Sequence, residues 1–144
     1  TSADEPPQVG FKPALIERVN VDGSGRTQIK WIEIYGNLDW SWVNNTITYY
    51  NANIRLEIFS MNPDGTDVNP ITPLPEDSDA AYKNPNWSPD GKKIVFDGEI
   101  YNQFNSNKDI YIVDVDTGEI INITSEFDSD DKMPDWQPIL NRIN

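Results

Sequence analysis

Short runs of alternating apolar and polar residues, separated by turn-forming residues, make up most of this chain. In residues 84–124 they predict a strand ending at Trp87, a second strand through Phe96 and an outer hairpin of β-branched runs. The Ser-Pro-Asp-Gly turn at 88–91 joins the first two strands, because Pro presets one backbone angle and Gly accepts a left-handed one. Four antiparallel strands in about forty residues are typical of one β-propeller blade.

The same arrangement of apolar and turn residues recurs along the chain. Trp40, Trp87 and Trp136 hold equivalent positions, 47 and 49 residues apart. Three outer hairpins also match, at 16–23, 58–65 and 110–117. A period of this length predicts a repeat array, in which we expect the three tryptophans to be structural anchors packed between blades. Trp31 and Trp42 lie outside this register, and we expect them at the surface.

One copy resembles a known repeat. Residues 85–96, Pro-Asn-Trp-Ser-Pro-Asp-Gly-Lys-Lys-Ile-Val-Phe, are followed by Asp-Ile-Tyr-Ile-Val-Asp at 109–114 and by Ile-Thr at 123–124. This run resembles the WD40-like PD40 repeat of the TolB propeller family, and the resemblance covers nearly all of residues 14–144. The first copy departs from it at 42–44, where Trp-Val-Asn replaces Pro-Asp-Gly, and the last copy continues as Gln-Pro-Ile-Leu at 137–140. The resemblance implies a six-bladed propeller in the bacterial periplasm or outside the cell.

With the strands of a blade labelled a to d from the centre outward, the chain divides into a tether and four pieces of propeller. Residues 1–13 are polar and Pro-rich and predict a flexible N-terminal tether. The repeats at 14–144 comprise a c-d hairpin (15–30), a blade (38–72), a second blade (85–124) and an a-b hairpin (134–144).

These pieces amount to about three blades, whereas a closed propeller has at least about four. We therefore predict a homodimer, in which the a-b hairpin ending one chain pairs with the c-d hairpin beginning the other and closes six blades. The alternatives are that the chain is a fragment, or that another subunit supplies the missing blades.

Composition narrows the chemistry. Of the 144 residues, 37% are hydrophobic, enough for a core, and the formal net charge of −13 argues against binding to nucleic acid or anionic membranes. The chain has no His and no Cys, which excludes Ser-His-Asp and Cys-His catalysis and the usual zinc ligands. No apolar run reaches about 18 residues, so we expect no direct membrane insertion. We also expect no cofactor and no bound metal.

In the propeller frame the long b-c and d-a loops share one face, where proteins usually place recognition residues. The candidates for partner binding on this face are Glu76, Asp77, Asp79, Tyr82, Glu99, Tyr101, Phe104, Phe127, Asp128, Asp130 and Asp131. An acidic rim with aromatic anchors suits a basic or amphipathic protein segment. The alternative for each single residue is that a charged loop only keeps the protein soluble.

Two other acidic patterns carry less weight. The Asp-Ser-Asp-Asp run at 128–131 offers oxygen ligands for Ca²⁺, but the EF-hand spacing is not met. Asp22, Asp64 and Asp90 each precede Gly, at turn positions where Asp and Gly are chosen for backbone angles.

The resulting hypothesis is a non-catalytic, TolB-like protein–protein interaction scaffold, which includes service as an accessory subunit of a cell-envelope complex. The alternative is a carbohydrate-active hydrolase or lyase that uses carboxylates on a propeller scaffold, although no spacing singles out a pair of acids. We predict no catalytic residues.

Overall fold

The computed structural model describes residues 13–32, 37–51, 56–74, 79–101, 107–125 and 129–137. Within these ranges the chain forms ten strands, and no helix is long and apolar enough to cross a membrane. The strands are β1 (Ala14–Arg18), β2 (Thr27–Ile32), β3 (Leu38–Ser41), β4 (Thr46–Asn51), β5 (Glu57–Met61), β6 (Asn69–Pro70), β7 (Ala80–Trp87), β8 (Lys93–Ile100), β9 (Lys108–Asp114) and β10 (Ile120–Asn122). All pair antiparallel, which confirms the predicted all-β class.

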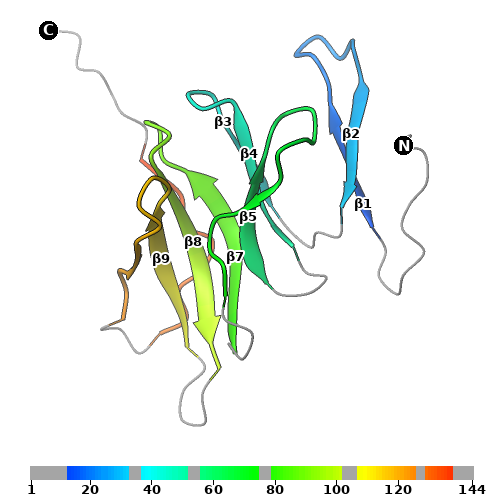
Figure 1. The fold of residues 1–144 in the computed structure, drawn as a ribbon. Helices are drawn as coiled ribbons and strands as arrows, with labels where there is room; N and C mark the ends of the chain where they lie inside the picture. The colour runs from blue at the N-terminus through cyan, green and yellow to red at the C-terminus, as the bar shows by residue number, and fades with distance from the viewer. Residues whose placement is uncertain are drawn as a thin grey trace, which may run out of the picture.

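The strands form one two-stranded and two four-stranded sheets, arranged as neighbouring propeller blades. The first blade has the order β3-β4-β5-β6 and the second the order β7-β8-β9-β10, each following the chain outward. Figure 1 shows the β1–β2 hairpin and the two blades side by side, with their short turns at one end. The inner strands β3 and β7 lie next to each other. A hydrogen bond joins them, in which the Trp87 N–H donates to Asp39 Oδ2 at 2.7 Å.

Two apolar clusters lie between these sheets. The cluster between the blades contains Tyr50, Ile58, Tyr82, Trp87, Ile94, Phe96, Tyr111 and Val113. The cluster between the β1–β2 hairpin and the first blade contains Ile16, Ile32, Ile47, Tyr49 and Met61. Tyr49 and Tyr50 are neighbours in β4 but belong to different clusters, because successive side chains of a strand point to opposite faces. Both faces of the first blade, and the face of the second blade that is turned toward it, are therefore buried against a neighbouring sheet.

Tyr82 is the clearest difference from the sequence-based prediction. We expected it in a long surface loop, but β7 begins at Ala80 and Tyr82 is only 7% exposed. Its ring meets the Phe96 ring edge-on, with 4.9 Å between centroids. The strand extends this far because the register shifts between Lys83 and Asn86, where Asn84 takes a left-handed conformation with a φ of 52°. Tyr82 is therefore a core residue of a strand, and its predicted place in a surface loop is wrong.

Two of the short turns are copies of each other at the level of single hydrogen bonds. In the β1–β2 turn, the Ser24 N–H and hydroxyl both donate to Asp22 Oδ1, at 2.9 and 2.7 Å. In the β5–β6 turn, the Thr66 N–H and hydroxyl donate to Asp64 Oδ1 in the same way, at 3.0 and 2.6 Å. The glycine that follows each aspartate has a φ near 84°, a conformation that favours Gly. These aspartates are turn residues, as the sequence indicated.

The outer ends of the two blades also share a hydrogen-bond pattern. The Thr72 hydroxyl accepts from the Ile58 N–H at 3.0 Å in the first blade. The Thr124 hydroxyl accepts from the Ile110 N–H at 2.9 Å in the second. The Ile-Thr pairs at 71–72 and 123–124 thus close equivalent blades on their outer strands.

The three repeat tryptophans have unlike surroundings. Trp87 is buried in the cluster between the blades, as predicted, whereas Trp40 and Trp136 are half-buried. The difference has a simple cause, since Trp87 has a complete blade in front of it and Trp40 has only the β1–β2 hairpin. Of the tryptophans outside the register, Trp42 is 87% exposed and Trp31 is half-buried.

Residues 129–137 form no strand and contact the second blade successively at β9, β8 and β7. The Trp136 indole N–H donates to the Asn86 carbonyl at 3.0 Å, and the Asn86 side-chain amide donates to the Pro134 carbonyl at 2.7 Å. The Met133 N–H donates to Asp97 Oδ1 at 3.2 Å. Of the a-b hairpin predicted at 134–144, the part beyond residue 137 lies outside the described residues.

Candidate functional site

The two ends of the second blade carry different groups of polar side chains, one at the long loops and one at the short turns. Their long-loop end brings together several of the predicted binding residues, which we name the loop-end cluster (Asp79, Glu99, Tyr101, Lys108 and Asp130). The Tyr101 N–H donates to the Asp79 carbonyl at 3.0 Å, and the Tyr101 hydroxyl donates to Glu99 Oε2 at 3.0 Å. The Lys108 ammonium lies 3.8 Å from the same Glu99 oxygen. The Lys108 N–H donates to Asp130 Oδ1 at 3.2 Å.

Hydrogen bonds set the electrostatics of this cluster. The bond to Glu99 raises the pKa of the Tyr101 phenol. The Lys108 N–H and the Lys132 ammonium lower the pKa of the Asp130 carboxylate. Two lysines therefore neutralise part of the predicted acidic rim. Tyr101 remains 48% exposed beside Ile100, which is 47% exposed, so an apolar patch is open to solvent at this end.

The remaining candidates differ in where they lie. Asp131 is half-buried, and its N–H donates to the Lys108 carbonyl at 2.7 Å. Its Oδ2 is buried without a hydrogen-bond partner among the described residues. The other predicted members are outside the described residues, namely Glu76, Asp77, Phe104, Phe127 and Asp128.

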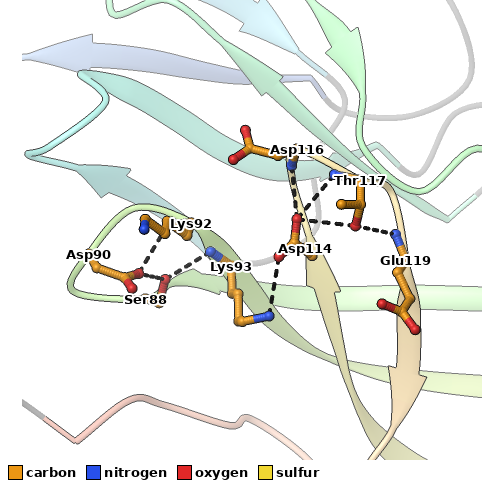
Figure 2. A network of polar contacts seen from close by, with 8 residues as sticks. All are labelled: Ser88, Asp90, Lys92, Lys93, Asp114, Asp116, Thr117 and Glu119. Carbon is orange, nitrogen blue, oxygen red and sulfur yellow. Dashed lines mark hydrogen bonds and ion pairs between the residues drawn. The ribbon is translucent and has the colours of Figure 1, made fainter.

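The opposite, short-turn end of the second blade carries a polar network, which Figure 2 shows from close by. The Ser88 hydroxyl donates to Asp90 Oδ1 at 2.7 Å, and the Lys93 ammonium donates to Asp114 Oδ2 at 3.3 Å. Asp114 Oδ1 also accepts from the N–H groups of residues 116 and 117. The Ser88 hydroxyl lowers the pKa of Asp90, and the Thr117 N–H lowers that of Asp114. These carboxylates cap backbone N–H groups, which is a structural role.

A groove of about 770 Å³ lies beside this network, at the same end of the inner strands. Its lining residues are Asp39, Trp40, Ser41, Trp42, Val43, Asn86, Trp87, Ser88, Pro89, Asp135 and Trp136. Trp42 stacks on Trp40, with 5.5 Å between ring centroids and 8° between ring planes. All three repeat tryptophans line this groove, so β3, β7 and the segment that contains Trp136 face one shared space.

The sequence-based prediction did not identify this groove as a site. A signal was present, because Asp39, Asn86 and Asp135 occupy the same repeat position and inner strands of a propeller face a common axis. A second signal was Trp42, which replaces the Pro of the closest-matching copy.

Among the described residues, no group of three or more Asp or Glu side chains is placed to hold a metal ion. The Asp-Ser-Asp-Asp run at 128–131, which was given little weight as a Ca²⁺ site, includes Asp128, which is outside those residues.

No protein-family model matches this chain, and no curated protein matches it. Solved structures do match. TolB from Acinetobacter baumannii superposes with a TM-score of 0.59 at 20% identity, over 77% of this chain and 26% of that chain. An oligogalacturonate lyase in complex with manganese superposes with a TM-score of 0.58 at 19% identity, over 75% of this chain and 29% of that chain.

Both relatives are β-propellers, and at this level of identity the likeness shows the fold alone. This chain spans less than a third of either protein.

Proposed function

We propose that this chain is a non-catalytic, TolB-like propeller scaffold that binds a basic or amphipathic segment of a protein partner at its long-loop end. The observation that carries this proposal is the loop-end cluster, where Glu99, Asp130 and the exposed Tyr101 are held at the ends of a rigid sheet. Recognition residues on loops that a rigid scaffold positions need little ordering on binding. The likeness to TolB supports a propeller scaffold of this kind.

The setting we propose is the bacterial periplasm or the extracellular space, with the chain acting as an accessory subunit of a cell-envelope complex. This follows the TolB-like fold rather than any residue of the chain.

A photo-crosslinking amino acid at residue 101 tests the proposal. In an envelope fraction it should give a discrete crosslinked protein, and the same label at Val21 should not, since Val21 is fully exposed in the β1–β2 turn at the other end. The identified partner should then bind the purified chain more weakly after Glu99→Gln. Identical products from both labelled positions would contradict the proposal.

The alternative function is that of a carbohydrate-active hydrolase or lyase, and the fold likeness to an oligogalacturonate lyase suggests the substrate with which to test it. The purified chain, incubated with oligogalacturonate and manganese, should release no unsaturated sugar. Turnover that survives repurification would replace the scaffold proposal with an enzymatic one.

We also propose that two chains close a six-bladed ring. β1 pairs with β2 on one side, and its other edge pairs with no strand of the described residues. β1 also lines a groove of about 360 Å³ together with residues of β2, β3 and β4, and its apolar lining residues include Leu15, Ile16, Leu38 and Trp40. An open strand edge next to apolar surface favours strand addition. The occupant we propose is the a-b hairpin at 134–144 of a second copy; a different subunit that supplies the missing blades is the alternative.

A further inference from the structure

The turn between β3 and β4 exposes two large apolar side chains. Trp42 is 87% exposed and Val43 is 63% exposed. The equivalent turn of the second blade has Pro89 and Asp90 at these positions. It keeps the same register, because Trp87 pairs with Ile94 as Trp40 pairs with Ile47. Hairpin geometry therefore does not require an indole here, and keeping one in water is unfavourable. Trp42 and Val43, with Trp40 stacked on Trp42, form an apolar patch in the groove lining, and exposed apolar patches mark interaction sites.

Trp42 is also held in a defined orientation. It lies nearly parallel to Trp40, with 8° between the ring planes. Across the groove, Trp136 is fixed by its indole hydrogen bond to the Asn86 carbonyl. The groove thus has ordered aromatic walls, and its volume of about 770 Å³ is within the range of small-ligand sites.

Charge selects among the possible occupants. The lining residues include two carboxylates, Asp39 and Asp135, and no Lys or Arg. Asp135 is exposed, and Asp39 already accepts the Trp87 N–H through one of its oxygens. The carboxylates would repel an anionic ligand. A cation would be attracted both by the carboxylates and by the faces of the indole rings.

We propose that this groove binds an arginine side chain from an extended segment of a protein partner. The planar guanidinium stacks on the exposed face of Trp42 or Trp136 and pairs with Asp135 or Asp39. Arginine fits better than lysine, because its weakly hydrated planar fork both stacks on aromatic rings and bonds carboxylates in pairs. The site lies at the opposite end of the strands from the loop-end cluster, so it does not depend on the function proposed above.

The test uses the full chain and two blocked peptides, acetyl-Gly-Arg-Gly-Arg-Gly-amide and its counterpart with citrulline in place of arginine. Citrulline keeps the shape and removes the charge. Titration calorimetry gives the affinity, and the indole N–H signals in a nitrogen-15 correlation spectrum report the site. We expect saturable binding of the arginine peptide that shifts the Trp42 signal, with the citrulline peptide about tenfold weaker or more.

Variants separate the groove from the general negative charge of the protein. Trp42→Ser leaves the charge unchanged and should weaken binding about tenfold or more, and Trp42→Phe should restore part of the loss. Asp135→Asn should weaken binding, whereas Asp116→Asn, which removes one charge from the same end outside the groove lining, should leave it within about twofold.

Equal affinity of wild type and Trp42→Ser would overturn the proposal, as would equal binding of the two peptides. Saturable binding of maltopentaose with a Trp42 shift, without binding of the arginine peptide, would assign the groove to a neutral sugar instead. None of these outcomes bears on crosslinking at residue 101.

Discussion

At the residue scale, Gly98 is held between two tyrosine rings. A Cβ at this position would lie 2.7 Å from a Tyr82 ring carbon and 2.8 Å from the Tyr111 ring. Both rings belong to the cluster between the blades, where overpacking typically costs about 1–3 kcal/mol. We expect Gly98→Ala to lower the free energy of unfolding by about that amount in urea titrations.

Gly118→Ala is the matched control. That position is open, with no atom within 4 Å of the added Cβ, but its φ is 73°. Only backbone strain applies, so we expect a loss of about 1–2 kcal/mol without a clash against an aromatic ring. A Gly98→Ala protein as stable as wild type would show that the tyrosines rearrange freely.

The sequence indicated the turn residues but not which aromatic residues are buried. Asp22, Asp64 and Asp90 were correctly interpreted, because turn chemistry is local and depends on a few neighbouring residues. Tyr82 was misplaced, because the left-handed Asn84 and the shifted register that lengthen β7 leave no clear pattern in sequence. The groove lined by Trp40, Trp87 and Trp136 is formed by residues of three repeat copies. The sequence does not show that these residues come together, because this depends on how the copies pack.

At the element scale, the outer strand of each blade is fastened by a threonine hydroxyl. Thr72 is fully buried and accepts the Ile58 N–H, whereas the equivalent Thr124 is half-buried. Replacing Thr72 by Val leaves that N–H without its acceptor in a dry site, which costs about 1–3 kcal/mol. We expect Thr124→Val to cost less, because water reaches the freed N–H there. Urea titrations of both variants test the order, and a reversed order would contradict it.

The turns also predict a dependence on pH. The folded-state pKa of Asp90 is lowered by its bonds from the Ser88 hydroxyl and the Lys92 N–H. A carboxylate with a lowered pKa contributes stability above its ordinary pKa of about 4 and loses that contribution as the pH falls through the folded value. We expect Asp90→Asn to be less stable than wild type at neutral pH, and the difference to shrink towards pH ~3.

Thermal unfolding of both proteins across this range measures the difference directly. As the pH falls, protonation of carboxylates reduces the negative net charge of both proteins, and the effect of this change on stability is nearly the same in each. Asp116→Asn is the control, because the Asp116 carboxylate accepts no hydrogen bond from the described residues. A gap between wild type and Asp90→Asn that stays constant with pH would show that the Asp90 charge contributes nothing.

At the scale of the whole molecule, the two blades and the β1–β2 hairpin form an open arc in the described residues. The repeat period predicted the blades and their antiparallel order well, because each blade is built from local hairpins. The outer edge of β1 pairs with no strand of the described residues, and a single sequence does not show what pairs with it.

The oligomeric state in solution distinguishes a homodimer from a chain that a different subunit completes. We expect light scattering at micromolar concentration to give twice the mass of the 16.4 kDa chain, because this open β1 edge and the apolar groove that β1 lines favour strand addition. Leu15→Asp places a charge in that groove and should give a monomer, whereas Val21→Asp in the exposed β1–β2 turn should not. Truncation of residues 135–144 should also abolish the dimer. A well-folded wild-type monomer, or a dimer unchanged by the truncation, would show that the ring is not closed by this hairpin and would favour completion by a different subunit.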